Sequence, residues 1–146
     1  MKIFAFLLTC CFSLSAAGLP EVGDRPVPFA LSDQFGKDRN VTATTKTIFY
    51  TPDKKATKIM EALLEKQPGL LEKLSGVYVA DLSSVPFFVI RGYILPAWRD
   101  LPYPVLIIDD ELSPVIFPAQ LEHVTVMELE NGVIRKIRYL ASPEAF

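Results

Sequence analysis

The stretch TIFYTPDKKATKIMEALLEKQ, from Thr47 to Gln67, decides the fold of this chain. It starts with a short apolar, β-prone run that predicts a buried strand. Thr51-Pro52-Asp53 then has the composition of a helix start, with a capping hydroxyl, Pro at the first helical position and an acid in the first turn. Apolar residues follow at spacings of three and four, which predicts a helix with one buried face: Ala56, Ile59, Met60, Leu63 and Leu64. Because Pro68-Gly69 comes next, we expect the helix to end by Gln67.

Shorter elements flank this strand and helix. Three leucines after Gly69 predict a further helical turn, and Phe87–Leu95 predicts a short helix that is capped by Ser83 or Ser84 and ends before Pro96. Val124–Leu129 and Val133–Leu140 predict a hairpin, because Asn131-Gly132 lies between them. The irregular spacing of Ile134, Ile137 and Tyr139 leaves the buried face of that hairpin open. The other expected strands are Val27–Leu31, Asn40–Thr45, Val77–Asp81 and Val105–Ile108, the last of them opened by Pro104.

The order of these elements predicts the fold class. Two strands come first, then strand, helix, strand, helix and strand, and finally the hairpin. A strand–helix–strand–helix–strand core implies parallel pairing through crossover helices, and the hairpin adds antiparallel strands. We therefore expect a mixed α/β sheet with helices on both faces.

Length and charge limit the classes of function. The chain has 146 residues and a net charge of −2, and no repeat or change in composition divides it. One domain over residues 18–146 is therefore expected. The charge argues against nucleic acid as a partner, since binding to phosphates needs a basic face. The sequence contains no Gly-rich nucleotide-binding motif.

The amino end has the pattern of a secretory signal. Lys2 precedes an apolar run of about a dozen residues, too short to cross a bilayer comfortably, and Ser15-Ala16-Ala17 supplies the small residues that a signal peptidase reads. We expect cleavage after residue 17 and export to the periplasm or the exterior, with no stable membrane span afterwards. Lipidation at Cys10 and a retained anchor are the alternatives. Cleavage would remove Cys10 and Cys11, the two Cys of the chain.

Several stretches carry a resemblance to a known family. Val22-Gly23-Asp24-Arg25-Pro26-Val27-Pro28-Phe29, followed by Leu31-Ser32-Asp33-Gln34-Phe35-Gly36, resembles the opening of the thioredoxin-like redoxins. The segments around Ala80–Ser83, Leu95–Asp100 and Tyr103–Leu106 are similar to small exported members of that superfamily. The resemblance covers nearly the whole chain after residue 17. It implies a thioredoxin-like three-layer α/β/α fold with a mixed central sheet and a C-terminal β-hairpin.

The same resemblance argues against redoxin chemistry. Members of the family place a reactive Cys where the first core strand enters the first core helix, because a helix N-terminus stabilises a thiolate. Here that window, Tyr50–Thr57, contains no Cys. The family also usually has a cis-proline before the final hairpin, and Glu122–Thr125 contains no Pro. The resemblance thus implies a small exported member that lacks the redox cysteines.

Several residues remain as candidates for a site. Thr51, Pro52, Asp53 and Lys54 lie where the family's active site would be, and Lys55 follows them. They form either a groove that has lost its thiols or an ordinary helix start with solvated lysines. His123, the single histidine, is either an acid/base residue lining that groove or a plain surface histidine.

An aromatic segment with two arginines follows the second core strand. We expect Phe87 and Phe88 to pack in the core, and Trp98-Arg99, between prolines, to be exposed and available for binding. Asp109-Asp110-Glu111 could hold a hard cation, but three consecutive acids fit an exposed turn better. No metal site and no cofactor are expected.

Three functions are compatible with these observations. The first is an exported binding or accessory protein without thiol–disulfide activity, whose partner is an unknown protein or small molecule. The second is an enzyme on the same scaffold, peroxidase- or hydrolase-like, that uses Asp53, Lys54 and His123 in acid/base chemistry. The third is a reductase that keeps Cys10 and Cys11 because the signal is not cut.

Overall fold

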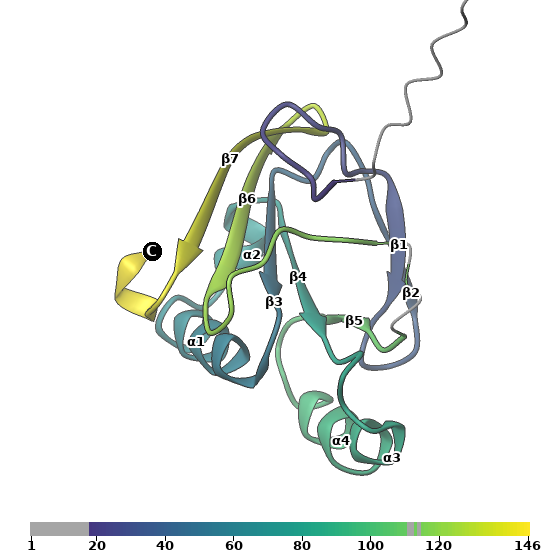
Figure 1. Ribbon diagram of the computed structural model, residues 1–146. Helices are drawn as coiled ribbons and strands as arrows, with labels where there is room; N and C mark the ends of the chain where they lie inside the picture. The colour runs from purple at the N-terminus through teal and green to yellow at the C-terminus, as the bar shows by residue number, and fades with distance from the viewer. Residues whose placement is uncertain (1–17, 111–112, 114) are drawn as a thin grey trace, which may run out of the picture.

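A mixed sheet forms the centre of the structure (Figure 1). The computed structural model describes residues 18–110, 113 and 115–146, so the expected signal segment, residues 1–17, and Glu111 lie outside the described residues. Five strands form the sheet in the order β5-β4-β3-β6-β7, and β1 and β2 pair separately. The strands are β1 (Phe29–Ser32), β2 (Asp38–Val41), β3 (Thr47–Thr51), β4 (Gly76–Asp81), β5 (Leu106–Ile108), β6 (Val124–Glu130) and β7 (Val133–Leu140).

The sheet topology confirms the predicted fold class. Strands β3, β4 and β5 are parallel, whereas β6 is antiparallel to both β3 and β7. Two helices follow β3 on the way to β4: α1 (Lys54–Lys66) and α2 (Leu70–Lys73). A second helical segment connects β4 to β5 and comprises α3 (Phe87–Val89), the π-helix η1 (Ile90–Ile94) and α4 (Leu95–Trp98). A short 3₁₀ turn, η2 (Pro143–Ala145), follows the hairpin.

Helix α1 forms as its sequence predicts, except at its first turn. The five apolar residues of the predicted face are all buried, and Gln67 is the C-cap. The expected cap, Thr51, is instead the last residue of β3 and is buried. Asp53 is the N-cap, because its backbone is extended (φ −153°) and its side chain accepts hydrogen bonds from two N–H groups of the first turn.

The two faces of the sheet carry different layers. Helices α1, α2 and the α3–α4 segment pack on one face, in a cluster that includes Phe49, Tyr78 and Val126. The other face is covered by residues of β1, β2 and the segment before β6, among them Val41 and Phe117. Within the described part of the chain no helix contributes to this second cluster, so a β-hairpin takes the place expected for a helix.

The α3–α4 segment differs from its prediction at Pro96. The helix was expected to stop before this proline, yet it continues to Trp98. Pro96 lies at the first turn of α4, directly after the wider π-turn η1, in which the N–H of Leu95 donates to the carbonyl oxygen of Ile90. Neither serine caps the segment, since Pro86 occupies the N-cap position.

The C-terminal hairpin has the predicted turn and an explained irregularity. Asn131 (φ 51°) and Gly132 (φ 79°) both take the left-handed conformation that a two-residue hairpin turn requires. The register shifts between Glu128, which pairs with Lys136, and Leu129, which pairs with Ile134. The extra residue is Arg135, so Ile134 and Ile137 reach the same face despite their odd spacing.

The described helices are also short relative to a bilayer. Within residues 18–110, 113 and 115–146, no helix is long and apolar enough to cross a membrane.

Candidate functional site

The N-terminus of α1 holds the carboxylate of Asp53. Oδ1 of Asp53 accepts hydrogen bonds from the N–H groups of Lys55 and Ala56, each at 2.9 Å. Oδ2 accepts a third hydrogen bond, at 2.6 Å, from the N–H of Glu122. One side chain therefore caps the helix and ties it to the loop before β6.

Sheet topology brings that loop to Asp53. Because β6 runs antiparallel to β3, with Tyr50 paired to Thr125, the start of β6 lies beside the end of β3. Glu122 has a positive φ of 65°, and its carboxylate forms an ion pair with Lys55 at 2.7 Å. The contact between loop and helix thus consists of one hydrogen bond to Asp53 and one exposed ion pair.

The environment of Asp53 favours its charged form. Burial by itself raises the pKa of this carboxyl, but the N–H groups of Glu122, Ala56 and Lys55 donate to the carboxylate and outweigh burial. The net result is a pKa below the ordinary value of 3.8. The positive end of the helix dipole lies at the same place. A carboxylate therefore uses the free N–H groups that would stabilise a thiolate in a redoxin.

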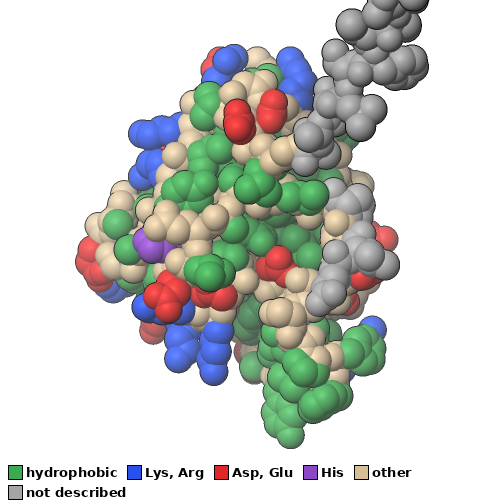
Figure 2. All heavy atoms as spheres, viewed as in Figure 1, with side chains coloured by type: hydrophobic (Ala, Val, Ile, Leu, Met, Phe, Trp, Pro, Cys, Tyr) green, Lys and Arg blue, Asp and Glu red, His purple; other side chains and the backbone are tan. Residues whose placement is uncertain are grey.

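The structure brings the other predicted site residues, His123 and Lys54, near Asp53 without hydrogen bonds between their side chains. Nδ1 of His123 lies 2.8 Å from the carbonyl oxygen of Leu121, within its own loop. Its Nε2 is 3.4 Å from the side-chain nitrogen of Gln120. Lys54 is exposed, and no ion pair to it is found within the described residues. Figure 2 shows the histidine on the surface, close to acidic and basic side chains. The structure thus gathers Asp53 and His123 at one end of the sheet without a hydrogen bond between their side chains.

Thr51 belongs to a buried hydroxyl cluster at the end of β3. Its Oγ1 lies 3.3 Å from the Tyr78 hydroxyl, and Thr57 donates to it at 3.2 Å. Burial raises the pKa of Tyr78 well above its ordinary value of 10.0, so the phenol stays protonated. Pro52 is half-buried between this cluster and the cap. These hydroxyls hold the end of β3 against β4 and α1.

A second polar cluster was not predicted from the sequence. The Tyr50 hydroxyl donates to Oδ2 of Asp81 at 2.8 Å, and Ser83 donates to Oδ1 through its hydroxyl and its N–H. Ser83 therefore stabilises the turn after β4 and does not cap a helix. The Tyr50 ring also stacks on Phe117 with centroids 4.8 Å apart. The β-prone sequence of Thr47–Thr51 gives no sign of the bond to Asp81, because that partner is 31 positions away.

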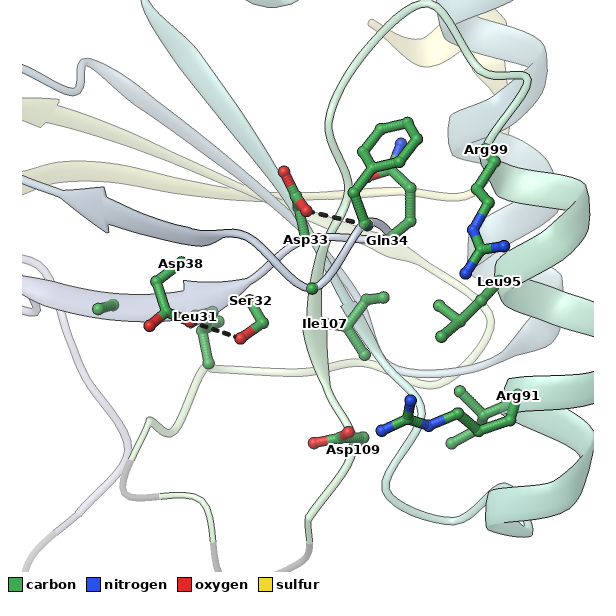
Figure 3. Close-up of a pocket in the computed structure, with 14 residues that line it drawn as sticks. Leu31, Ser32, Asp33, Gln34, Asp38, Arg91, Leu95, Arg99, Ile107 and Asp109 are labelled. Atoms are coloured by element: carbon green, nitrogen blue, oxygen red, sulfur yellow. Dashed lines mark hydrogen bonds between the residues drawn. The ribbon is translucent and has the colours of Figure 1, made fainter.

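A cavity of about 560 Å³ lies between β1 and the α3–α4 segment (Figure 3). Arg91, Leu95 and Arg99 recur every four residues and present one helical face to it, while Asp33 and Asp38 line the opposite wall. The buried Asp33 is paired with Arg39 at 2.9 Å. Its pKa is raised by burial and lowered more strongly by Arg39 and two N–H donors, so it lies below the ordinary value. Because Arg39 compensates Asp33, the exposed Asp38 supplies the negative charge on the wall opposite Arg91 and Arg99.

Gln34 fixes one side of this cavity to the helical segment. Its side chain is 1% exposed, and its Nε2 donates to the carbonyl oxygens of Trp98 (3.2 Å) and Tyr103 (2.9 Å). Its Oε1 accepts from the N–H of Val105 at 2.9 Å. Gln34 was not predicted as a site residue, because nothing local marks a glutamine whose partners are more than sixty positions away.

Two expectations about the aromatic segment were wrong. Phe87 and Phe88 are 64% and 71% exposed, whereas Trp98 is 8% exposed and packs in the core. Arg99 is exposed as expected and lines the cavity. The reason is the helical phase: Ile90, Leu95 and Trp98 face the sheet, so the phenylalanines at the start of α3 point outward. Figure 2 shows hydrophobic side chains gathered over this lobe, and Arg91 lies 4.9 Å from the Phe87 ring.

The expected acidic turn follows β5. Asp109 and Asp110 are exposed, and Glu111 lies outside the described residues. In the part of the chain that the structure describes, no group of three His, Cys, Asp or Glu side chains is arranged to hold a metal ion.

Comparison with known proteins supports the fold at low sequence identity. No model of a known protein family matches the chain, and no curated protein matches it. A candidate thiol:disulfide interchange protein, DsbE, from Chlorobium tepidum is similar in structure, with a TM-score of 0.56 and 14% identity over 88% of this chain and 93% of that one. A peroxiredoxin-like protein from Aquifex aeolicus matches with a TM-score of 0.51 and 12% identity over 86% of this chain and 80% of that chain.

A third solved structure, a SCO1/SenC family lipoprotein from Bacillus anthracis str. Ames, matches with a TM-score of 0.50 and 13% identity over 84% of this chain and 89% of that one. Together with the mixed five-stranded sheet, the flanking helices and the C-terminal hairpin, these likenesses define a thioredoxin-like fold.

Proposed function

We propose that this chain is an exported thioredoxin-fold protein that has no thiol–disulfide activity and acts by binding. One observation carries the proposal. Where a redoxin presents a thiolate, the N-terminus of α1 is capped by Asp53, which also accepts the N–H of Glu122. A carboxylate there cannot form a disulfide, and residues 18–146 contain no Cys.

The same hydrogen bonds argue against acid/base catalysis in the groove. A general base needs to reach the proton that it removes. Both oxygens of Asp53 already accept N–H groups, and the lowered pKa of this carboxyl makes it a weak base near neutral pH. Lys55, the cation beside it, is paired with Glu122. Of the three candidates for non-thiol chemistry, Asp53 is therefore used to hold the loop and the helix together.

The compartment is part of the proposal. Residues 1–17 carry the pattern of a secretory signal, and we place the protein in the periplasm or outside the cell. Disulfides form in these compartments, but a redoxin scaffold without thiols cannot exchange them. We therefore propose that it acts by recognition alone. The end of the sheet that carries the Asp53 loop and the Arg99 cavity is the surface that we propose for recognition. Its ligand is a protein or a small molecule.

A reduction assay tests the proposal. The exported protein is incubated with insulin and dithiothreitol, and the turbidity from released insulin chains is followed beside a thioredoxin control. We expect the rate to equal that of dithiothreitol alone. Acceleration by the exported protein, lost when Cys10 and Cys11 are replaced by Ser, would overturn the proposal in favour of the uncut reductase.

A further inference from the structure

A second cavity lies between α1, α2 and the end of α4. Its volume is about 790 Å³, within the range of small-molecule sites in proteins. Leu64, Leu70, Leu71 and Trp98, all buried core residues, form its floor. Pro68, Leu101 and Pro102 extend the apolar wall. The α1 residues that line this cavity, Glu61, Leu64 and Glu65, lie in the C-terminal half of the helix, whereas Asp53 caps its N-terminus.

The rim of this cavity is acidic. Glu61 and Glu65 are one turn apart on α1, and Glu72 comes from α2. None of the three forms an ion pair within the described residues, and no Lys or Arg is among the described residues that line the cavity. Like charges at this helical spacing repel each other and destabilise the helix. The arrangement therefore concentrates negative charge beside an apolar surface.

Tyr103 lines the same cavity as Glu61 and Glu65 and interacts with their charges. Burial, followed by the charges of Glu61 and Glu65, raises the pKa of its hydroxyl to about 12. The Tyr103 ring also lines the cavity, next to the floor that contains Trp98. An aromatic ring beside two carboxylates offers a cation both a π-face and opposite charge.

The two cavities differ in their charge. The cavity in Figure 3 has arginines on one wall and aspartates on the other. The second cavity has acidic side chains alone around an apolar floor, so it selects one sign of charge. A ligand complementary to it has an apolar body and a positive group at its edge.

We propose that the cavity between α1, α2 and α4 binds a small hydrophobic cation, a protonated amine or guanidine with an apolar body. The apolar body lies on Leu64, Leu70 and Trp98, and the cation faces Glu61 and Glu65. This inference rests on the proposed binding function and adds a second binding surface, apart from the one at the Asp53 loop, together with its ligand class. A failure here would leave the redox-inactive proposal intact, because the insulin assay does not involve this cavity.

Three probes of one length test the ligand class: octylammonium, octan-1-ol and octanoate. Trp98 is the one Trp of the chain, so its emission reports binding directly, and titration calorimetry gives the affinity. We expect saturable binding of octylammonium that weakens with added salt. We expect octanoate to bind at least about tenfold more weakly. The carboxylates of Glu61 and Glu65 attract the ammonium group of octylammonium but repel the carboxylate of octanoate.

Matched variants test the residues. Glu61→Gln with Glu65→Gln should weaken octylammonium binding by about two- to fivefold per carboxylate and leave octan-1-ol unchanged. Glu21→Gln, which removes an exposed charge that is not part of the lining, should have no effect. Three results would each overturn the inference: equal affinity for all three probes, no binding of octylammonium, or an octylammonium affinity that is unchanged when Glu61 and Glu65 are replaced by Gln.

Discussion

Replacing Asp53 with Ala should destabilise the protein more than an ordinary surface substitution does. The change removes the acceptor of three N–H groups: those of Lys55 and Ala56 in the first turn of α1, and that of Glu122 in the loop before β6. Alanine cannot replace any of these bonds. The helix loses its cap, and the loop loses its hydrogen bond to the helix.

The magnitude follows from the two parts. Loss of an Asp N-cap to Ala costs about 1 kcal/mol. Loss of the Glu122 hydrogen bond to a charged acceptor adds about 1 kcal/mol, because water partly replaces it in this exposed loop. The free energy of unfolding should therefore fall by about 2 kcal/mol. With a urea dependence of about 2 kcal/mol per M, the midpoint should move down by about 1 M.

Asp53→Asn separates the two parts. Asparagine is a good N-cap, so its side-chain oxygen keeps the bonds to Lys55 and Ala56. Its amide nitrogen is a donor and cannot accept from the N–H of Glu122. We expect Asn to lose about half of what Ala loses, roughly 1 kcal/mol. Urea unfolding of the exported protein, followed by Trp98 emission and far-ultraviolet circular dichroism, gives both values.

The difference between wild type and Asp53→Asn should also depend on pH. The pKa of Asp53 is lowered in the folded protein from its ordinary value of 3.8, so its stabilising effect is complete above that value. It should disappear as pH falls through the lower, folded pKa. An alanine variant as stable as wild type, an asparagine variant as unstable as alanine, or an advantage that grows as pH falls would refute this reasoning.

Three other substitutions test separate parts of the account. Asp53→Cys places a thiol at the start of α1, and we expect its pKa, read from thiolate absorbance, to lie clearly below about 8.5; an equal pKa for Lys136→Cys, on an exposed strand, would contradict this. Gln34→Ala should lower the free energy of unfolding in urea by about 2–4 kcal/mol and move Trp98 emission to longer wavelength, because two carbonyls and one N–H lose a buried partner. An unchanged urea midpoint would show that these three hydrogen bonds do not stabilise the fold. Phe88→Ser should change the thermal midpoint little, since this side chain is 71% exposed; a large drop would mean that Phe88 is packed after all.

The local part of the fold could be predicted from the sequence. The spacing of Ala56, Ile59 and Met60 predicts the buried face of α1, and Asn131-Gly132 predicts the hairpin turn. Both signals are local: one is a helical period, and the other is a pair of residues that tolerates positive φ.

The interactions between distant segments could not be predicted in the same way. Asp53 was expected at the helix start, but its bond to Glu122 spans 69 positions and depends on β6 lying beside β3. The exposure of Phe87 and the burial of Trp98 were assigned the wrong way round, because the π-turn and Pro96 set the phase of a helix expected to end earlier. Aromatic content alone does not say which face of a short helix meets the sheet.

The mass of the exported protein, measured after alkylation with iodoacetamide under denaturing and reducing conditions, tests the central claim most directly. We expect a chain that begins near Gly18 and takes up no alkyl group, because both Cys precede that residue. A mass that retains Cys10 and Cys11 and increases by two alkyl groups would contradict a thiol-free exported protein.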